Sequence, residues 1–173
     1  MSARLKYRQL SCQDNLDEIV ELVNAAYRGV SGPRRWTTEA HLVQGERLQK
    51  VDLERQVASG EIALYAGYVD ERPVCCIALK RDDQVTEFGT FAVDPELHGL
   101  GFGKRLLDMA ESSARPYARI FQVSVVTQNA DLVRFYERRG YSRTGQTLAY
   151  PVGQRVGEPM IEGISLTVLQ KNA

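Results

Sequence analysis

A glycine-rich turn between a strand-like and a helix-like segment constrains the fold of this chain more than any other feature. An apolar run over 88–93 stops at Asp94-Pro95. Three glycines then follow at alternate positions, Gly99, Gly101 and Gly103. From residue 106 onward, apolar residues recur at helical spacing. The stretch therefore predicts a strand, a glycine turn and a helix in that order.

This arrangement is suited to binding an anion. Glycine reaches backbone conformations that other residues avoid, and it lets a ligand approach the main chain. The first amides of the following helix have no partner inside the helix, and that end carries partial positive charge. Together these features predict a phosphate site, with a plain tight connection in an α/β domain as the alternative. The spacing fits neither a P-loop nor a dinucleotide fingerprint, whose third glycine is replaced here by Leu106.

The bulk composition is that of an ordinary soluble domain. The chain has 173 residues, of which 43% are hydrophobic and 25% are charged. We expect residues 1–173 to form one domain with its own core. Lys plus Arg and Asp plus Glu both number 22, so the net charge is zero. This balance argues against a nucleic-acid partner.

Cysteine and histidine usage bears on compartment and metals. The odd number of cysteines, Cys12, Cys75 and Cys76, argues against a disulfide framework and favours a reducing, cytoplasmic compartment. Adjacent Cys75 and Cys76 should point to opposite faces of a strand. With two histidines and no C-x-x-C, the sequence predicts no metal site. It shows no signal-peptide core and no apolar run of about 18 residues, so we expect no membrane association.

The remaining patterns predict a mixed α/β (α+β) fold. Strands are predicted over 5–10, 62–68, 74–80, 85–93, 120–126, 141–151 and 164–169, and helices over 16–27, 51–59, 101–114 and 131–139. A short helix is predicted after Thr37 or Thr38, ending at Gly45, and 153–159 is predicted to be a loop. Short turns should join the strands over 62–93 into an antiparallel meander. The helix over 101–114 connects two strands and so implies one parallel pair, a place that ligands favour.

Two motifs resemble those of the GNAT superfamily of acyl-CoA-dependent N-acetyltransferases. The first, His98-Gly99-Leu100-Gly101-Phe102-Gly103, is similar to motif A, [Q/R]-x-x-G-x-[G/A], with His98 in place of Gln or Arg. The second is similar to motif B, and its matching residues are Asn129, Leu132, Phe135, Tyr136, Gly140 and Tyr141. By element order the resemblance covers the whole chain. It implies a mostly antiparallel sheet flanked by helices, with a parallel, splayed pair of strands at the cofactor cleft.

The resemblance also implies acetyl-CoA as co-substrate and assigns residues to it. Pantetheine would pair with the backbone of the strand before motif A, at Phe91, Ala92 and Val93. The pyrophosphate would lie on the turn and the start of the helix, at His98, Gly99, Leu100, Gly101, Phe102, Gly103 and Lys104. Asn129 is carried over as a further cofactor contact, with helix capping as the alternative. His98 can still donate a hydrogen bond to a phosphate oxygen.

Acyl transfer to an amine needs a base for the amine and an acid for the leaving thiolate. The resemblance places Tyr136 near the CoA sulfur, where its phenol can serve as the acid. The resemblance also implies Glu87, on the strand before motif A, as the candidate base, and alternation would put Glu87, Gly89, Phe91 and Val93 on one face. Its carboxylate would lie among apolar neighbours, which would raise its pKa. The alternative for Tyr136 is that it is only an aromatic residue packed on its helix, and the alternative for Glu87 is that it is a solvated charge on its strand. A nucleophilic Cys75 or Cys76 is not needed for direct transfer in a ternary complex.

The resemblance implies a small-molecule or peptide amine as the acceptor, and the sequence does not name it: peptide N-terminus, protein lysine, polyamine, amino acid and antibiotic all stay open. The resemblance points to the region between the first two strands as one wall of its site, with Arg34, Arg35, Trp36 and His41 as candidates. Tyr150 is a further candidate. Two other functions stay open. One is a catalytically idle domain of this fold that binds acyl-CoA as a sensor or interaction module. The other is an acyltransferase that uses another acyl chain or an oxygen acceptor. The final strand could pair with a second copy in a homodimer.

Overall fold

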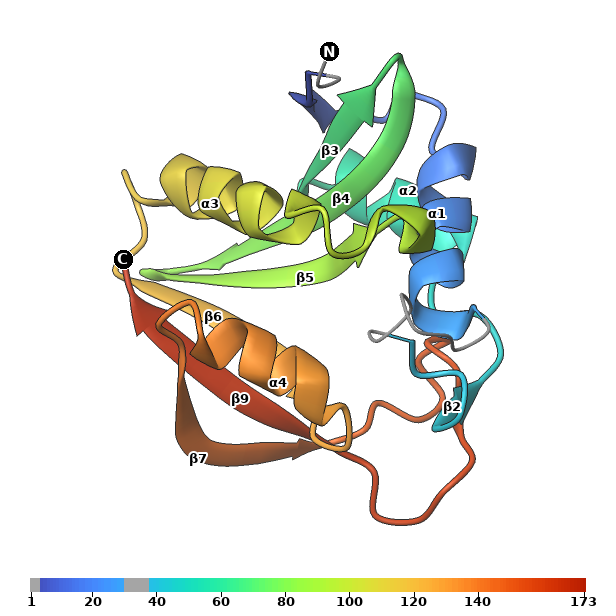
Figure 1. Cartoon of the computed structure of the whole chain (residues 1–173), viewed down its shortest axis with the longest axis vertical. Helices are drawn as coiled ribbons and strands as arrows, with labels where there is room; N and C mark the ends of the chain where they lie inside the picture. The colour runs from blue at the N-terminus through green and yellow to red at the C-terminus, as the bar shows by residue number, and fades with distance from the viewer. Residues whose placement is uncertain (1–3, 30–37) are drawn as a thin grey trace.

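The structure of the protein, a computed structural model, describes residues 4–29 and 38–173. Its main feature is a seven-stranded sheet whose strands, in spatial order, are β1 (Lys6–Leu10), β3 (Ala63–Val69), β4 (Arg72–Asp82), β5 (Val85–Val93), β6 (Ile120–Val126), β9 (Ser165–Asn172) and β7 (Ser142–Ala149). The helices are α1 (Asp17–Arg28), α2 (Lys50–Ala58), α3 (Phe102–Ala114) and α4 (Ala130–Glu137) (Figure 1). The predicted meander over β3, β4 and β5 is confirmed, because both of its pairings are antiparallel.

Helices cover both faces of the sheet, and the burial of β4 reflects this. Its central residues are buried and apolar on both sides, as expected of a strand with both faces covered. Cys75 belongs to the core under α3 and α4, whereas Cys76 belongs to the core under α1 and α2. The prediction that these two neighbours point to opposite faces is therefore confirmed.

The parallel pair of strands, β5 and β6, is joined for only part of its length. Their pairing runs from Val85 opposite Ile120 to Phe88 opposite Val123. Beyond those residues the strands continue to Val93 and Val126 without pairing to each other. Figure 1 shows them starting together and then diverging. The predicted splayed parallel pair is confirmed, and the facing backbone edge of β5 after Phe88 is open to a ligand.

A β-bulge in β5 changes which residues share a face. Gly89 pairs with Ala78, but Ala92 pairs with Cys76, so Thr90 and Phe91 together oppose one residue of β4. Thr90 has φ 47°, a conformation that costs a β-branched residue about 1–3 kcal/mol. The predicted alternation is consequently wrong. Phe91 joins the core under α3 and α4, while Glu87, paired with Lys80, lies on the opposite face.

The segment before α2 also differs from its prediction. Residues 38–44 form no helix; they end in the short strand β2 (Val43–Gln44), which pairs with β8 (Glu158–Pro159). The loop over 153–159 therefore contributes a strand to this pair. Leu42 and Val43 bury against Val126 and Tyr150, and this long-range packing has no counterpart in the local sequence pattern.

The C-terminal strand lies inside the sheet. β9 pairs with β6 along one edge and with β7 along the other. It has no open edge, so the expectation that the final strand pairs with a second copy is wrong. At this end of the sheet the open edge belongs to β7, whose residues are all exposed.

A buried ion pair ties α3 to β9 and gives a stability prediction. Glu111 is 4% exposed and accepts hydrogen bonds from Lys171 Nζ at 2.8 Å and from the Tyr141 hydroxyl at 3.0 Å. Lys171→Met should lower the free energy of unfolding by about 3 kcal/mol, because it removes the close cation of a buried carboxylate and leaves only Arg115, 3.9 Å away. Urea unfolding measures this. The control Lys50→Met, at a surface pair with Asp17, should cost less than about 1 kcal/mol. Equal losses in the two variants would contradict the prediction.

Candidate active site

The glycine turn has the geometry that an anion site needs. Gly99 and Gly101 have φ of 82° and 80°, which favours glycine at both positions. Gly101 precedes the first residue of α3, so the free amides of that helix face the turn. Asp94 stabilises the segment before the turn: it accepts a hydrogen bond from the Glu96 amide at 3.0 Å and forms an ion pair with Arg72.

His98 lies at the start of this turn. Its Nε2 is 3.1 Å from the carbonyl oxygen of Val93 and donates to it. That nitrogen therefore fixes the turn to the end of β5, and any contact of the ring with a phosphate would use its other side.

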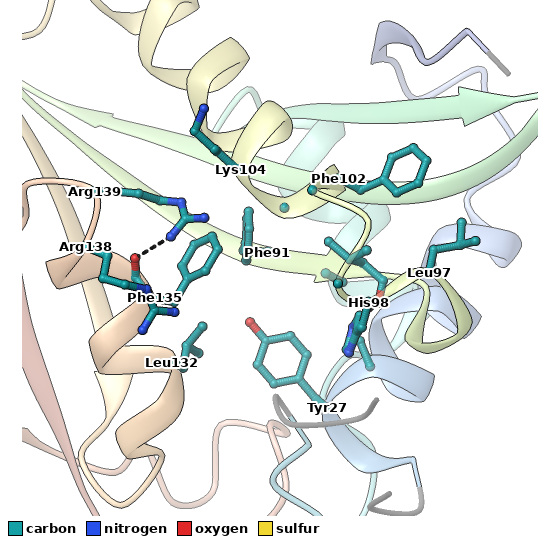
Figure 2. Close-up of a pocket in the computed structure, with 16 residues that line it drawn as sticks. Tyr27, Phe91, Leu97, His98, Phe102, Lys104, Leu132, Phe135, Arg138 and Arg139 are labelled. Atoms are coloured by element: carbon teal, nitrogen blue, oxygen red, sulfur yellow. Dashed lines mark hydrogen bonds between the residues drawn. The ribbon is translucent and has the colours of Figure 1, made fainter. Parts of the chain in front are cut away.

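A cavity of about 240 Å³ opens between the turn, the end of β5 and α4. Figure 2 shows side chains from all three entering it. Most predicted cofactor residues line it: Phe91, Ala92, Val93, His98, Gly99, Gly101, Phe102, Gly103 and Lys104. Three predicted residues, Leu100, Asn129 and Tyr136, do not line it. Leu100 is 63% exposed and points away from the core.

Sequence reasoning missed two arginines of this cavity, Arg138 and Arg139. Arg139 stacks over the Phe135 ring, with 3.6 Å between its guanidinium carbon and the ring centroid, and donates to the Phe135 carbonyl oxygen at 2.8 Å. Burial lowers the pKa of Arg139, and neighbouring Arg138 lowers it further. With Lys104 they place three basic side chains on the left of the cavity in Figure 2. The basic pair inside motif B, directly before Gly140, was the available signal.

Tyr136 is buried in an aromatic cluster beside the cavity. Its ring centroid lies 5.3 Å from that of Phe135, 5.4 Å from that of Tyr141 and 6.1 Å from that of Phe91. Burial raises the pKa of the Tyr136 hydroxyl well above its usual value, and the nearby Tyr27 raises it further. The hydroxyl therefore stays protonated at neutral pH and can donate a proton.

Tyr27, on α1, is a second tyrosine of the site and was not predicted. Its hydroxyl points into the middle of the cavity, between Phe91 and Leu132 (Figure 2). Burial raises the pKa of Tyr27 to about 12. The sequence pattern assigned this residue to the apolar face of a helix, which its ring does occupy.

A smaller cavity of about 100 Å³ lies next to the first one. Tyr27 and Leu132 line both, so the two cavities are neighbours near the place where β5 and β6 separate. Its polar lining residues are Tyr27, Glu39, Arg47, Ser124 and Tyr150. Of the predicted acceptor residues, Tyr150 lines this cavity. His41 is exposed and does not, and Arg34, Arg35 and Trp36 lie outside the described residues.

Asn129 begins α4 and connects it to the second cavity. Its Oδ1 accepts from the Leu132 amide at 3.3 Å, which is a helix-capping contact. Its Nδ2 is 3.5 Å from Glu39 Oε1. In this structure the Asn129 side chain thus caps the start of α4 and contacts Glu39.

Glu87 has polar neighbours, not the apolar ones that were predicted. It accepts from Gln122 Nε2 at 2.8 Å, and Gln122 Oε1 in turn accepts from Gln170 Nε2 at 2.7 Å. These three residues form a row across β5, β6 and β9. Glu87 lines neither cavity.

The cysteines are poorly suited to act as nucleophiles. Cys75 and Cys76 are fully buried. Burial raises the pKa of Cys75 to about 12, and it also raises that of Cys76. A thiol in this state carries almost no thiolate at neutral pH. Within residues 4–29 and 38–173, no group of three potential metal ligands occurs, and no helix is long and apolar enough to cross a membrane.

Comparison with known proteins identifies the family to which this fold and site belong. Residues 36–150 match the family model described as an acetyltransferase (GNAT) domain. This match covers most of the chain, so the chain belongs to the GNAT acetyltransferase family. No curated protein matches the sequence.

Solved structures share the fold over the full length of the chain. An IAA acetyltransferase from Bacillus cereus aligns with a TM-score of 0.71 at 14% identity, covering 98% of this chain and 100% of its own. A GNAT family acetyltransferase from Elizabethkingia anophelis with acetyl-CoA bound aligns with a TM-score of 0.71 at 13% identity, covering 98% of each chain. The PaiA N-acetyltransferase from Thermoplasma acidophilum in complex with coenzyme A aligns with a TM-score of 0.70 at 19% identity, covering 98% of this chain and 99% of its own. The mixed sheet with one parallel pair is thus the GNAT fold.

Proposed function

We propose that the protein is an N-acetyltransferase that moves the acetyl group of acetyl-CoA directly to a primary amine. The observation that carries this proposal is that two neighbouring cavities share Tyr27 and Leu132 as lining residues, near the separated ends of β5 and β6. One cavity suits a long phosphorylated co-substrate and the other a small acceptor. Both molecules would then reach the same point from opposite sides.

The residues of the larger cavity fit acetyl-CoA. The turn at Gly99 and Gly101 and the start of α3 would bind the pyrophosphate, and the basic side chains would bind the outer phosphates. The backbone of β5 after Phe88 is unpaired towards β6 and would hydrogen-bond pantetheine like an added strand. When bound, acetyl-CoA would supply an acetyl group on a thioester.

Proton transfer would be carried out by this chain's own side chains. Tyr136 is the proposed acid for the leaving thiolate, and Tyr27 lies beside it with its hydroxyl in the cavity. Both stay protonated at neutral pH because burial raises their pKa. Direct transfer agrees with the two buried cysteines, which offer no thiolate.

Release of free thiol from acetyl-CoA, measured across amino acids, peptides, polyamines and other amines, tests this function. We expect release that depends on one class of amine, together with acetylated product in the mass spectrum. The Tyr136→Phe variant is the matched control and should bind acetyl-CoA but release thiol slowly. Binding of acetyl-CoA without release on any amine would contradict the proposal and favour a sensor.

A further inference from the structure

Glu39 is a buried carboxylate with weak partners. It is 3% exposed, and its two hydrogen bonds, from Arg28 Nη1 and Asn129 Nδ2, are both 3.5 Å long. This is the outer limit of a hydrogen bond. A buried carboxylate normally needs close donors or a close cation to offset its lost hydration. Glu39 lines the smaller cavity, so a cation placed there would supply what the protein does not.

Arg28 pairs with Glu39 only at 3.5 Å, because its other guanidinium nitrogens are held elsewhere. Its Nε donates to the Gly45 carbonyl oxygen at 2.9 Å, and its Nη2 donates to that of Val156 at 2.6 Å. The arginine is thus occupied in joining α1 to the loop before β8. Glu39 is fixed in turn, because its amide donates to the Tyr27 carbonyl oxygen at 2.8 Å. The backbone that carries this carboxylate is therefore held in place at the cavity wall.

Arg47 provides the opposite charge in the same cavity. Its guanidinium lies over the ring of Tyr27, 5.2 Å from the centroid, and lines the cavity. Within residues 4–29 and 38–173, neither a hydrogen bond nor an ion pair occupies this guanidinium. Ser124 is similar: its buried hydroxyl lines the cavity and has no hydrogen-bond partner in that part of the chain. One anionic, one cationic and one neutral polar group are thus left with capacity for a ligand.

We propose that this cavity binds a small zwitterionic acceptor such as an amino acid, whose ammonium contacts Glu39 and whose carboxylate contacts Arg47. This inference rests on the proposed N-acetyltransferase function and adds the acceptor class and the base. A cavity of about 100 Å³ suits a small molecule or the end of a larger one. A polyamine fits poorly, because Arg28 and Arg47 together outweigh the charge of Glu39.

Glu39 would also accept the proton that the amine must lose. The carboxylate takes one proton from the ammonium, and the neutral nitrogen forms the C–N bond to the acetyl carbon. The C–S bond breaks with its electron pair going to sulfur, which takes a proton from the Tyr136 hydroxyl. The remaining extra proton on nitrogen returns through water to the tyrosine, and Glu39 loses its proton to solvent. The balance is one amide, one free thiol and one released proton.

The pH dependence follows from the groups around Glu39. Burial raises the pKa of Glu39, while Arg28 and Arg47 partly lower it, and Tyr27 and Tyr150 line the same cavity. Below the pKa of Glu39 in the folded protein the carboxyl is neutral and accepts no proton. The kcat/KM for the acceptor should therefore rise as pH increases through that pKa.

The test compares acceptors and variants by kcat/KM, with acetyl-CoA affinity as the second readout. The probes are small L-amino acids, their amides, which lack the carboxylate, and a linear diamine. Wild type should prefer amino acids to their amides at least tenfold, and Arg47→Gln should remove this preference. Glu39→Gln should lower kcat/KM at least a hundredfold and abolish its rise with pH, whereas Glu39→Asp should keep the rise. Acetyl-CoA affinity should stay within twofold in all three variants, which also shows that they fold.

A matched control is Glu54→Gln, a change on the exposed side of α2, which should alter none of these quantities. Preference for amides or the diamine would overturn this inference and leave N-acetyl transfer intact. An unchanged pH profile in Glu39→Gln, or its loss in Glu87→Gln instead, would also overturn it. Absence of thiol release with every acceptor would overturn the proposed function itself.

Discussion

Gly101→Val should weaken acetyl-CoA binding at least tenfold. Gly101 has φ 80° directly before α3, a conformation that costs a β-branched residue about 1–3 kcal/mol. The chain can relieve this strain by moving the turn, which would displace the amides that bind the pyrophosphate. A Cβ at this position meets no atom within 4 Å, so the effect would come from the backbone and not from a clash.

Gly145→Val is the matched control for this change. Gly145 has φ 84° and equally open space, but it lies on the exposed strand β7, away from both cavities. Both variants should lose similar stability, whereas only Gly101→Val should lose affinity in calorimetry with acetyl-CoA. Unchanged affinity in Gly101→Val, or an equal loss in both, would contradict the phosphate site at this turn.

Tyr136→Phe should lower kcat at least a hundredfold, in line with the loss of a general acid, and leave acetyl-CoA affinity unchanged. The ring stays in its aromatic cluster, so the change removes a proton donor without removing packing. Tyr27→Phe keeps its ring contacts in the same way and deletes the hydroxyl that points into the cavity. The variant with the larger loss of kcat identifies the acid.

Tyr117→Phe controls for the loss of a tyrosine hydroxyl elsewhere. Tyr117 lies after α3, with Arg81 stacked over its ring at 4.6 Å, and should show normal kcat. Because burial raises the pKa of both site tyrosines, wild-type kcat should not fall between neutral and mildly alkaline pH. Full activity in both Tyr136→Phe and Tyr27→Phe would contradict a tyrosine acid.

The parts of the fold that were predicted are those with local signals. The meander follows from short turns, and the parallel pair follows from a helix between two strands. The glycine turn and most of its cavity residues follow from one motif. The bulge at Thr90 was missed, and its one local signal is Gly89 inside the strand. That single extra residue put Glu87 on the face opposite Phe91, and the pairing of β5 with β6 gave Glu87 its neighbour Gln122.

The second cavity was beyond prediction because distant segments build it. Glu39 comes from a segment that was predicted to be a helix, and Tyr150 comes from the far end of β7. They meet through the pairing of β2 with β8, which is only two residues long. Tyr27 was assigned to helix packing, and its spacing gives no sign that its hydroxyl reaches a cavity. Contacts between segments this far apart depend on the completed fold.

Transfer of a labelled acetyl group tests the central claim most directly. The enzyme would be mixed with an excess of acetyl-CoA, labelled with carbon-13 in the acetyl group, and the best amine acceptor. Mass spectrometry would then follow both the acceptor and the protein. The label should appear on the nitrogen of the acceptor, and the protein mass should stay unchanged throughout. A labelled protein that forms before the product, or label that never reaches an amine, would contradict direct N-acetyl transfer between the two cavities.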